Sequence, residues 1–80
     1  NPDFDSVSKI TSNQINFIDV IAKRCDINVH NVIRQLDIVA EGVYNIKHED
    51  AVKLVKELTS LQTNTSNIGA GLLGYEESWK

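Results

Sequence analysis

Residues that carry metal or redox chemistry are scarce in this sequence, which has one cysteine and two histidines among its 80 residues. Cys25 has no second cysteine with which to form a disulfide, and this indicates a reducing, cytoplasmic environment. Together with His30 and His48 it does not show the spacing of a structural zinc site. The sequence therefore predicts neither a bound metal nor a cofactor.

Long apolar runs are also absent, since no stretch approaches the roughly 18 residues that a membrane-spanning helix requires. The first nine residues, NPDFDSVSK, have neither the basic nor the apolar region of a signal peptide. They lack Met and are rich in Asp and Ser, so we expect residues 1–9 to be a linker from a larger protein. No membrane partner is expected.

The remaining composition is that of a soluble globular domain, with 41% hydrophobic and 24% charged residues. A chain of this size forms one domain at most and has a small core, so a large substrate cavity is not expected. The net charge is -3, although residues 8–62 carry seven basic and seven acidic side chains. This balance does not favour general nucleic-acid binding, which needs clustered Lys and Arg.

The segment ITSNQI, residues 10–15, has the pattern of a strongly specified helix start. Thr11 and Gln14 are spaced as a capping box, in which each side chain accepts a hydrogen bond from the other residue's backbone N–H. Ile10 and Ile15 occupy the positions of a hydrophobic staple. Apolar residues then recur at helical spacing, which predicts a helix from about Ser12 to Cys25. Positions expected to face outward or to flank its apolar face are Asn16, Asp19, Lys23 and Arg24.

A second helix is expected to begin at Asn28, a favourable N-cap, and to end near Asp37 or Ile38. Its apolar face is formed by Val29, Val32, Ile33 and Leu36. Because most of these residues are β-branched and have weak helical propensity, packing has to stabilise this helix. Residues 38–45 either continue the helix and then form a loop, with Gly42 as a left-handed residue, or form a short strand that has no evident partner.

The segment IKHEDA, residues 46–51, repeats the ITSNQI arrangement in a weaker form, because Lys47 stands where a capping hydroxyl is expected. Glu49 and Asp50 still favour the positive end of a helix. A third helix is predicted from about His48 to Leu61, with its apolar face formed by Ala51, Leu54, Val55, Leu58 and Leu61. Three amphipathic helices with short connections predict an all-α, three-helix bundle over residues 10–62.

The C-terminal segment, residues 63–80, begins with polar residues and continues as IGAGLLG and YEESWK. This composition favours a flexible, irregular tail. Its glycines lack the preceding strand and the lysine of a phosphate-binding loop. Leu72, Leu73, Tyr75 and Trp79 are nevertheless costly to expose to water. Packing of part of the segment on the bundle or on a partner is therefore as well supported as a mobile tail.

Nothing in the sequence indicates catalysis. Carboxylate pairs such as Asp26 with Asp37, or Glu49 with Asp50, occur at predicted helix ends, where caps and exposed charges are usual. We therefore predict that this domain is not an enzyme.

Two features instead indicate binding of a macromolecule. Phe17 and Val20 lie beside the apolar face of the first helix, and Val52 is placed similarly on the third; if exposed, they provide more apolar surface than the core needs. Basic candidates for contacting an acidic partner are Lys23, Arg24, Arg34, Lys53 and Lys56. Helices that brought these basic residues together would permit direct DNA binding instead, and otherwise each is simply solvated.

Two helix starts, ITSNQINFIDVIAKRCDI and IKHEDAVKLVKEL, separated by a further helix, form a pattern that covers about residues 10–61. This pattern resembles the C-terminal domains of phage-type single-strand annealing recombinases, the family of the lambda Beta protein. The resemblance implies a small three-helix domain that docks protein partners, namely the cognate exonuclease and the acidic C-terminal tail of the host single-strand-binding protein. Lys47 departs from the family pattern, which has a Thr-like cap at this position.

The sequence and this resemblance together predict a non-catalytic recruitment domain of a larger protein of phage DNA recombination or replication. The alternative is a small helical DNA-binding domain that contacts nucleic acid directly.

Overall fold

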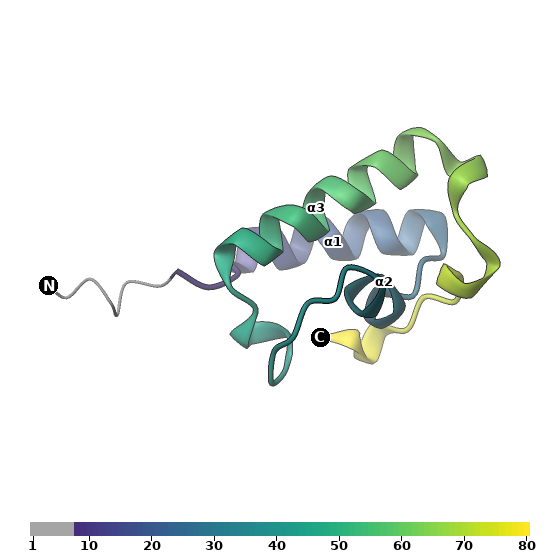
Figure 1. The fold of residues 1–80 in the computed structure, drawn as a ribbon. Coiled ribbons are helices and arrows are strands. Elements are labelled where there is room, and N and C mark those ends of the chain that lie inside the picture. The colour runs from purple at the N-terminus through teal and green to yellow at the C-terminus, as the bar shows by residue number, and fades with distance from the viewer. Residues whose placement is uncertain (1–7) are drawn as a thin grey trace, which may run out of the picture.

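The computed structural model describes residues 8–80 and shows three α-helices and no strand in that range (Figure 1). They are α1 (Ser12–Cys25), α2 (Val29–Gln35) and α3 (His48–Thr63). Short 3₁₀ turns lie at Val43–Asn45, Thr65–Asn67, Ala70–Leu72 and Glu77–Trp79. The predicted all-α, three-helix bundle with an irregular C-terminal segment is confirmed.

The first helix, α1, begins with the predicted capping box. Thr11 Oγ1 accepts a hydrogen bond from the Gln14 backbone N–H at 3.1 Å, and Gln14 Oε1 accepts one from the Thr11 N–H at 2.9 Å. Ile10 and Ile15, the two staple positions, are both buried. The helix ends at Cys25, as predicted, because Asp26 adopts a left-handed conformation (φ 56°), which Asp tolerates better than most residues.

The starts of α1 and α3 lie next to each other, so the two related sequence segments also meet in space. The Ile10 N–H donates to the Ile46 carbonyl at 2.8 Å, and the His48 N–H donates to the Ser8 carbonyl at 2.8 Å. As expected, Lys47 provides no side-chain cap for α3. The backbone pairing satisfies the first N–H of α3 instead, and both helices run in the same direction from this end (Figure 1).

The second helix, α2, is shorter than predicted, since it ends at Gln35 and not near Asp37 or Ile38. Asn28 caps its start as predicted, accepting a hydrogen bond from the Asn31 N–H at 3.2 Å. Asp37 adopts a left-handed conformation (φ 60°), which a continuing right-handed helix cannot include. Gly42 also has a positive φ, of 96°, but it precedes a 3₁₀ turn and does not end α2.

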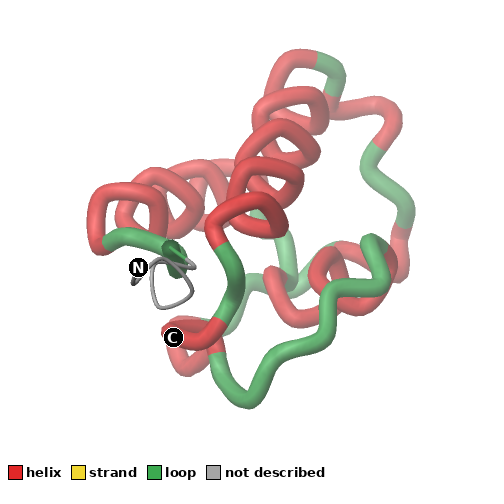
Figure 2. Tube along the Cα trace, turned by 60° about the vertical axis from the view of Figure 1, so that its left-hand side comes forward, coloured by secondary structure: helices red, strands yellow, loops and turns green. Residues whose placement is uncertain are grey.

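One hydrophobic core connects the three helices with the C-terminal segment. Side chains almost completely buried in it include Ile18, Ile27, Val32, Leu54, Leu58 and Trp79. The Asn28 N–H donates to the Leu72 carbonyl at 2.7 Å and the Gly74 N–H donates to the Asp26 carbonyl at 2.8 Å, so the C-terminal segment pairs with the loop between α1 and α2. Figure 2 shows α2 and this segment together on one side of α1 and α3. The segment thus supplies part of the core.

Residues 1–7, most of the predicted linker, lie outside the described residues. The last two residues of that linker, Ser8 and Lys9, pair with the start of α3, and Lys9 donates a hydrogen bond to Asn45 Oδ1 at 3.1 Å. The folded part of the chain therefore includes both residues.

Candidate functional site

A hollow between α1 and α3 combines the exposed Phe17 side chain and two partly buried valines with a basic side chain. It has a volume of about 390 Å³. Its lining comes from Asn13, Gln14 and Phe17 of α1 and from Val52, Val55 and Lys56 of α3. We term it the α1–α3 groove. Phe17 is 47% exposed, so much of its ring carbon lies in water, where it does not contribute to the stability of the core.

The backbone at one end of the domain fixes the two walls of this groove. The capping box holds Gln14 at the start of α1, and Phe17 follows one turn later. The backbone pairing of Ser8 with His48 holds the start of α3, and Val52 follows one turn later. Because both walls are helical and are joined where they begin, the apolar side chains are presented on a rigid frame.

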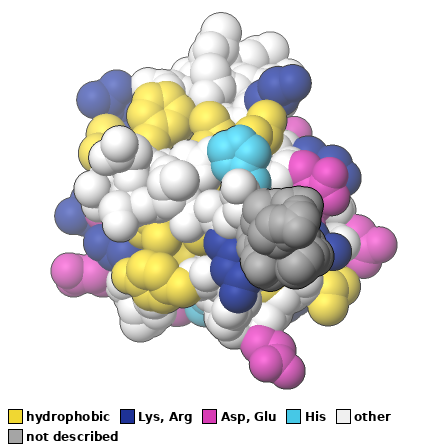
Figure 3. Space-filling view, turned by 90° about the vertical axis from the view of Figure 1, so that its left-hand side faces the viewer, with side chains coloured by type: hydrophobic (Ala, Val, Ile, Leu, Met, Phe, Trp, Pro, Cys, Tyr) yellow, Lys and Arg dark blue, Asp and Glu magenta, His cyan; other side chains and the backbone are white. Residues whose placement is uncertain are grey.

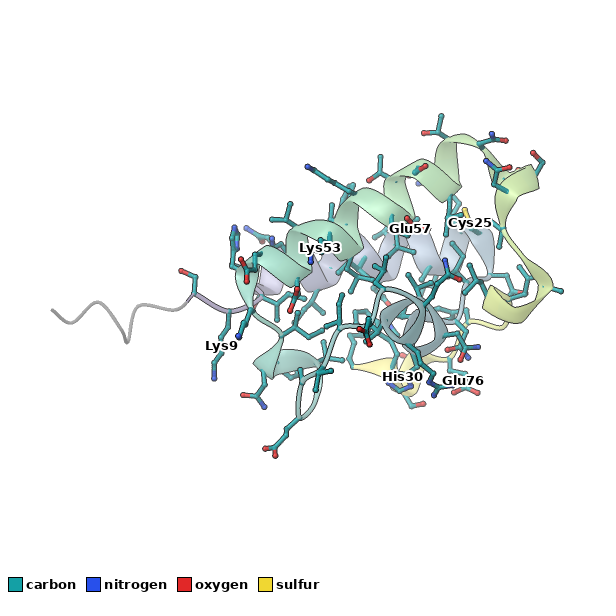
Figure 4. All side chains as sticks on the ribbon, in the orientation of Figure 1. Lys9, Cys25, His30, Lys53, Glu57 and Glu76 are labelled. Atoms are coloured by element: carbon teal, nitrogen blue, oxygen red, sulfur yellow. The ribbon has the colours of Figure 1, made fainter. Side chains whose placement is uncertain are left out.

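Two of the five predicted basic contact residues lie in or near the groove. Lys56 lines it, and Lys53 lies one turn earlier on α3 (Figure 4). The Lys53 Nζ is 3.7 Å from Asp50 Oδ1, but the Lys53 side chain is 64% exposed, so this pair is weak and leaves the ammonium group accessible. Figure 3, viewed from the end where α1 and α3 begin, shows surface hydrophobic side chains with Lys or Arg side chains to either side.

The other three predicted contact residues lie elsewhere. Lys23 and Arg24 are in the last turn of α1, at the opposite end from the start of α3 (Figure 1). Arg34 is on α2, donates a hydrogen bond to Asn31 Oδ1 at 3.4 Å and borders a separate hollow of about 490 Å³. The structure thus distributes the five basic residues over three places. This distribution does not favour the DNA-binding alternative, which needs clustered cations.

The sequence pattern did not predict that Asp19 is buried. It was expected to face outward or to flank the apolar face of α1, but it is buried, with 7% of its surface exposed. The Tyr75 hydroxyl donates to Asp19 Oδ1 at 2.5 Å, and the Trp79 Nε1–H donates to the same oxygen at 3.0 Å. Asp19 Oδ2 lies 3.6 Å from the Lys23 Nζ and 3.5 Å from the Lys80 Nζ. We term Asp19, Tyr75 and Trp79 the tail clamp.

One sequence signal pointed toward this clamp. Buried Tyr and Trp side chains need a hydrogen-bond partner for their polar groups. Asp19 lies one turn after Ile15 on the border of the apolar face, where it can act as the acceptor. The pairing itself could not be predicted, because Tyr75 and Trp79 are 56 and 60 positions away from Asp19 in the chain.

The tail clamp shifts the titration of two of its members. Burial alone would raise the pKa of the Asp19 carboxyl, but the hydrogen bonds from Tyr75 and Trp79 and the charges of Lys80 and Lys23 outweigh burial and hold this pKa below its ordinary value of 3.8. The hydrogen bond to Asp19, followed by burial, raises the pKa of Tyr75 to about 12. Neither group is poised to exchange a proton near neutral pH, so the clamp has a structural role.

The residues considered for metal or redox chemistry are dispersed. His30 and His48 are exposed, and Cys25 is half-buried against the core. Within residues 8–80, no group of three or more His, Cys, Asp or Glu residues is placed to hold a metal ion. Nor does any helix of that range combine the length and apolar character that crossing a bilayer requires.

Comparisons with protein-family models, with curated proteins and with solved structures found no match for this chain. The resemblance to phage annealing recombinases therefore rests on the two helix-start segments alone.

Proposed function

We propose that this chain is a recruitment domain, a non-catalytic domain that docks a partner protein in the α1–α3 groove. The observation that carries the proposal is the half-exposed Phe17 ring beside Val52 and Val55 in an open hollow. Aromatic side chains in such positions supply much of the binding energy at protein interfaces, because a partner side chain can cover them completely.

The charges at the groove indicate which partner it fits. Lys56 is the one charged residue among those that line the groove in the described part of the chain, and Lys53 lies a turn away. An acidic segment with an apolar anchor residue complements this arrangement, since opposite charges around an apolar contact select the partner and speed its encounter. The resemblance to annealing recombinases suggests the acidic tail of a single-strand-binding protein, and hence a role in phage DNA recombination or replication.

The proposal is tested by backbone amide NMR titration, once with an acidic tail peptide from a single-strand-binding protein and once with single-stranded DNA. We expect the peptide, and not the DNA, to shift the signals of Phe17, Val52 and Val55. Shifts caused by DNA alone would replace the proposal with direct DNA binding. An unchanged spectrum in both titrations would eliminate the acidic tail as the partner.

A pair of charge reversals tests the location of the contact. Lys56→Glu should weaken peptide binding by about threefold to tenfold, because it places a like charge beside the acidic segment. Arg24→Glu makes the same change at an exposed position at the far end of α1 and should leave the affinity unchanged. Equal losses from the two substitutions would show a general charge effect and not a contact in the groove.

A further inference from the structure

The loop that follows α2 holds an apolar side chain almost fully in water. Val39 is 88% exposed, more than any other large hydrophobic side chain in the described part of the chain. The backbone around it is anchored on both sides. Before Val39, the Ile38 N–H donates to the Ile33 carbonyl at 3.1 Å. After it, the Asn45 Nδ2 donates to the Glu41 carbonyl at 2.6 Å. Figure 1 shows this loop projecting from the body of the domain, away from α3.

A small apolar hollow of about 150 Å³ lies beside the same loop. Its lining comes from His30 and Ile33 of α2 and from Ala40, Gly42, Val43 and Ile46. A cavity of about this volume accommodates an apolar group as large as benzene, so the isopropyl group of a valine fits. Val39 does not line this hollow, and its high exposure shows that it does not fill the hollow of its own chain.

The charges of the loop and of the hollow are complementary. Glu41 is the one charged residue of the loop, residues 38–45. His30 is the one titratable residue among those that line the hollow in the described range. Both side chains are exposed, and His30 lies on the side of the domain toward which the loop projects (Figure 4). A carboxylate accepts a hydrogen bond from an imidazole N–H, whether the ring is neutral or protonated.

We infer that a second copy of this chain occupies the hollow, in a two-fold symmetric dimer formed through the two 38–45 loops. Val39 of each copy inserts beside Ile33 and Ile46 of the other, and Glu41 of each copy pairs with His30 of the other. In a two-fold arrangement each contact occurs twice, so that the projection and the hollow of one chain match those of the other. An interface of this small size belongs to the weak, reversible class.

The dimer is compatible with recruitment but does not rest on it. The hollow and the α1–α3 groove share no lining residue, so dimerisation leaves both grooves open. A dimer thereby presents two grooves to a partner that carries several acidic segments, and the second contact then forms within one complex.

The first test needs no partner and uses the full chain. Translational diffusion should slow, and the amide signals of His30, Val39 and Glu41 should shift, over a hundredfold range of concentration up to about 1 mM, where small interfaces associate. In a mixture of isotope-labelled and unlabelled chains, nuclear Overhauser contacts are expected between Val39 of one copy and Ile33 and Ile46 of the other. Diffusion that is independent of concentration would overturn the inference, and so would association without these contacts.

The second test uses a pair of valine substitutions. Val39→Ser should raise the dissociation constant of the dimer by at least about tenfold, because it removes an apolar contact from both halves of the interface. Val20→Ser is the matched control, since Val20 is 51% exposed on α1 and does not line the hollow. It should leave the constant unchanged, and equal increases from the two substitutions would place the interface elsewhere and overturn the inference.

The third test exchanges the two members of the charge pair. Glu41→Lys and His30→Glu should each raise the dissociation constant about threefold or more, because each removes the attraction between the copies. The double variant restores an opposite pair and should return the constant to within about twofold of the unaltered chain. A double variant that associates as weakly as the single variants would overturn the inference.

Discussion

At the scale of single residues, Asp19 and Phe17 show how two neighbouring positions of one helix acquire opposite roles. Asp19 is charged but buried, because Tyr75, Trp79 and Lys80 satisfy its carboxylate. Phe17 is aromatic but half-exposed, because no segment of residues 8–80 covers the groove in which it lies. A buried carboxylate with hydrogen-bond and ion-pair partners stabilises the fold, whereas an uncovered ring is available for binding.

Asp19→Ala is expected to lower the free energy of unfolding by about 2–3 kcal/mol, because it leaves the buried Trp79 N–H without an acceptor. Chemical denaturation followed by the fluorescence of Trp79, the only tryptophan, measures this change. Glu41→Ala, at an exposed acidic position, is the control and should have little effect. Equal stability of the Asp19→Ala chain and the unaltered chain would contradict the structural role of the clamp.

Phe17→Ala is expected to separate binding from stability. Its ring is half-exposed, so its loss should change the free energy of unfolding by less than about 1 kcal/mol, while binding of the acidic peptide should weaken more than about tenfold. Val20→Ala is the matched control, since Val20 is 51% exposed on the same helix but does not line the groove. Calorimetric titration of both variants checks this, and equal affinity losses would place the contact outside the groove.

At the scale of elements, the two related helix starts satisfy their first backbone N–H groups in different ways. Thr11 and Gln14 cap α1 with two side-chain hydrogen bonds, whereas Lys47 offers α3 none. The Ser8 carbonyl supplies α3 with one backbone acceptor in place of the missing cap. Pairing of the two starts therefore lets the stronger cap of α1 support the weaker start of α3.

Lys47→Ser is expected to stabilise the domain. Lys47 has the extended backbone conformation of an N-cap (φ -66°, ψ 150°), and Asp50 already stands three residues later. A serine there can accept a hydrogen bond from a free N–H of the first turn, which is worth about 0.5–1 kcal/mol. Thermal unfolding measures the gain, and Thr11→Ala should show a loss of about 1 kcal/mol in the same assay. A lower midpoint for Lys47→Ser would mean that the Lys47 side chain itself stabilises the loop.

At the scale of the whole molecule, the C-terminal segment makes the bundle complete. α2 is short, and its weak helix formers depend on neighbours for burial. Leu72 and Trp79 from the C-terminal segment complete the core. In a domain of this size, whose total stability is only a few kcal/mol, removal of such a segment affects all parts of the core.

The tail clamp predicts two pH limits for this arrangement. The pKa of Asp19 is lowered by folding, so its contribution is complete above about pH 4 and is lost as the pH falls through the still lower folded value. The pKa of Tyr75 is raised from 10.0 to about 12, so its contribution is complete below pH 10 and is lost as the pH rises from 10 to about 12. Urea midpoints measured against pH should therefore fall at both ends.

Two substitutions test whether Asp19 causes the acidic loss of stability and Tyr75 the alkaline one. Asp19→Asn should flatten the acidic decrease, because an amide does not titrate in this range. Tyr75→Phe should flatten the alkaline decrease for the same reason. Unaltered decreases in both variants would show that other groups set the pH limits.

The local features of this protein were determined by the sequence alone. Short-range hydrogen bonding and apolar periodicity depend only on residues that are close together in the chain. They determine the capping box at Thr11, the N-cap at Asn28, the bounds of α1 and the all-α class. The sequence also placed Phe17 beside the apolar face and not within it, so that its exposure would indicate partner binding. The Phe17 side chain is exposed in the structure.

The tertiary structure decided which distant segments meet. Only folding brings Trp79 to Asp19, pairs Ser8 with His48, and leaves Phe17 and Val52 as facing walls of one groove while it separates Arg34 and Lys23 from them. These contacts depend on which amphipathic helix faces pack against one another. The packing of the complete core determines this pairing, and no local sequence pattern does.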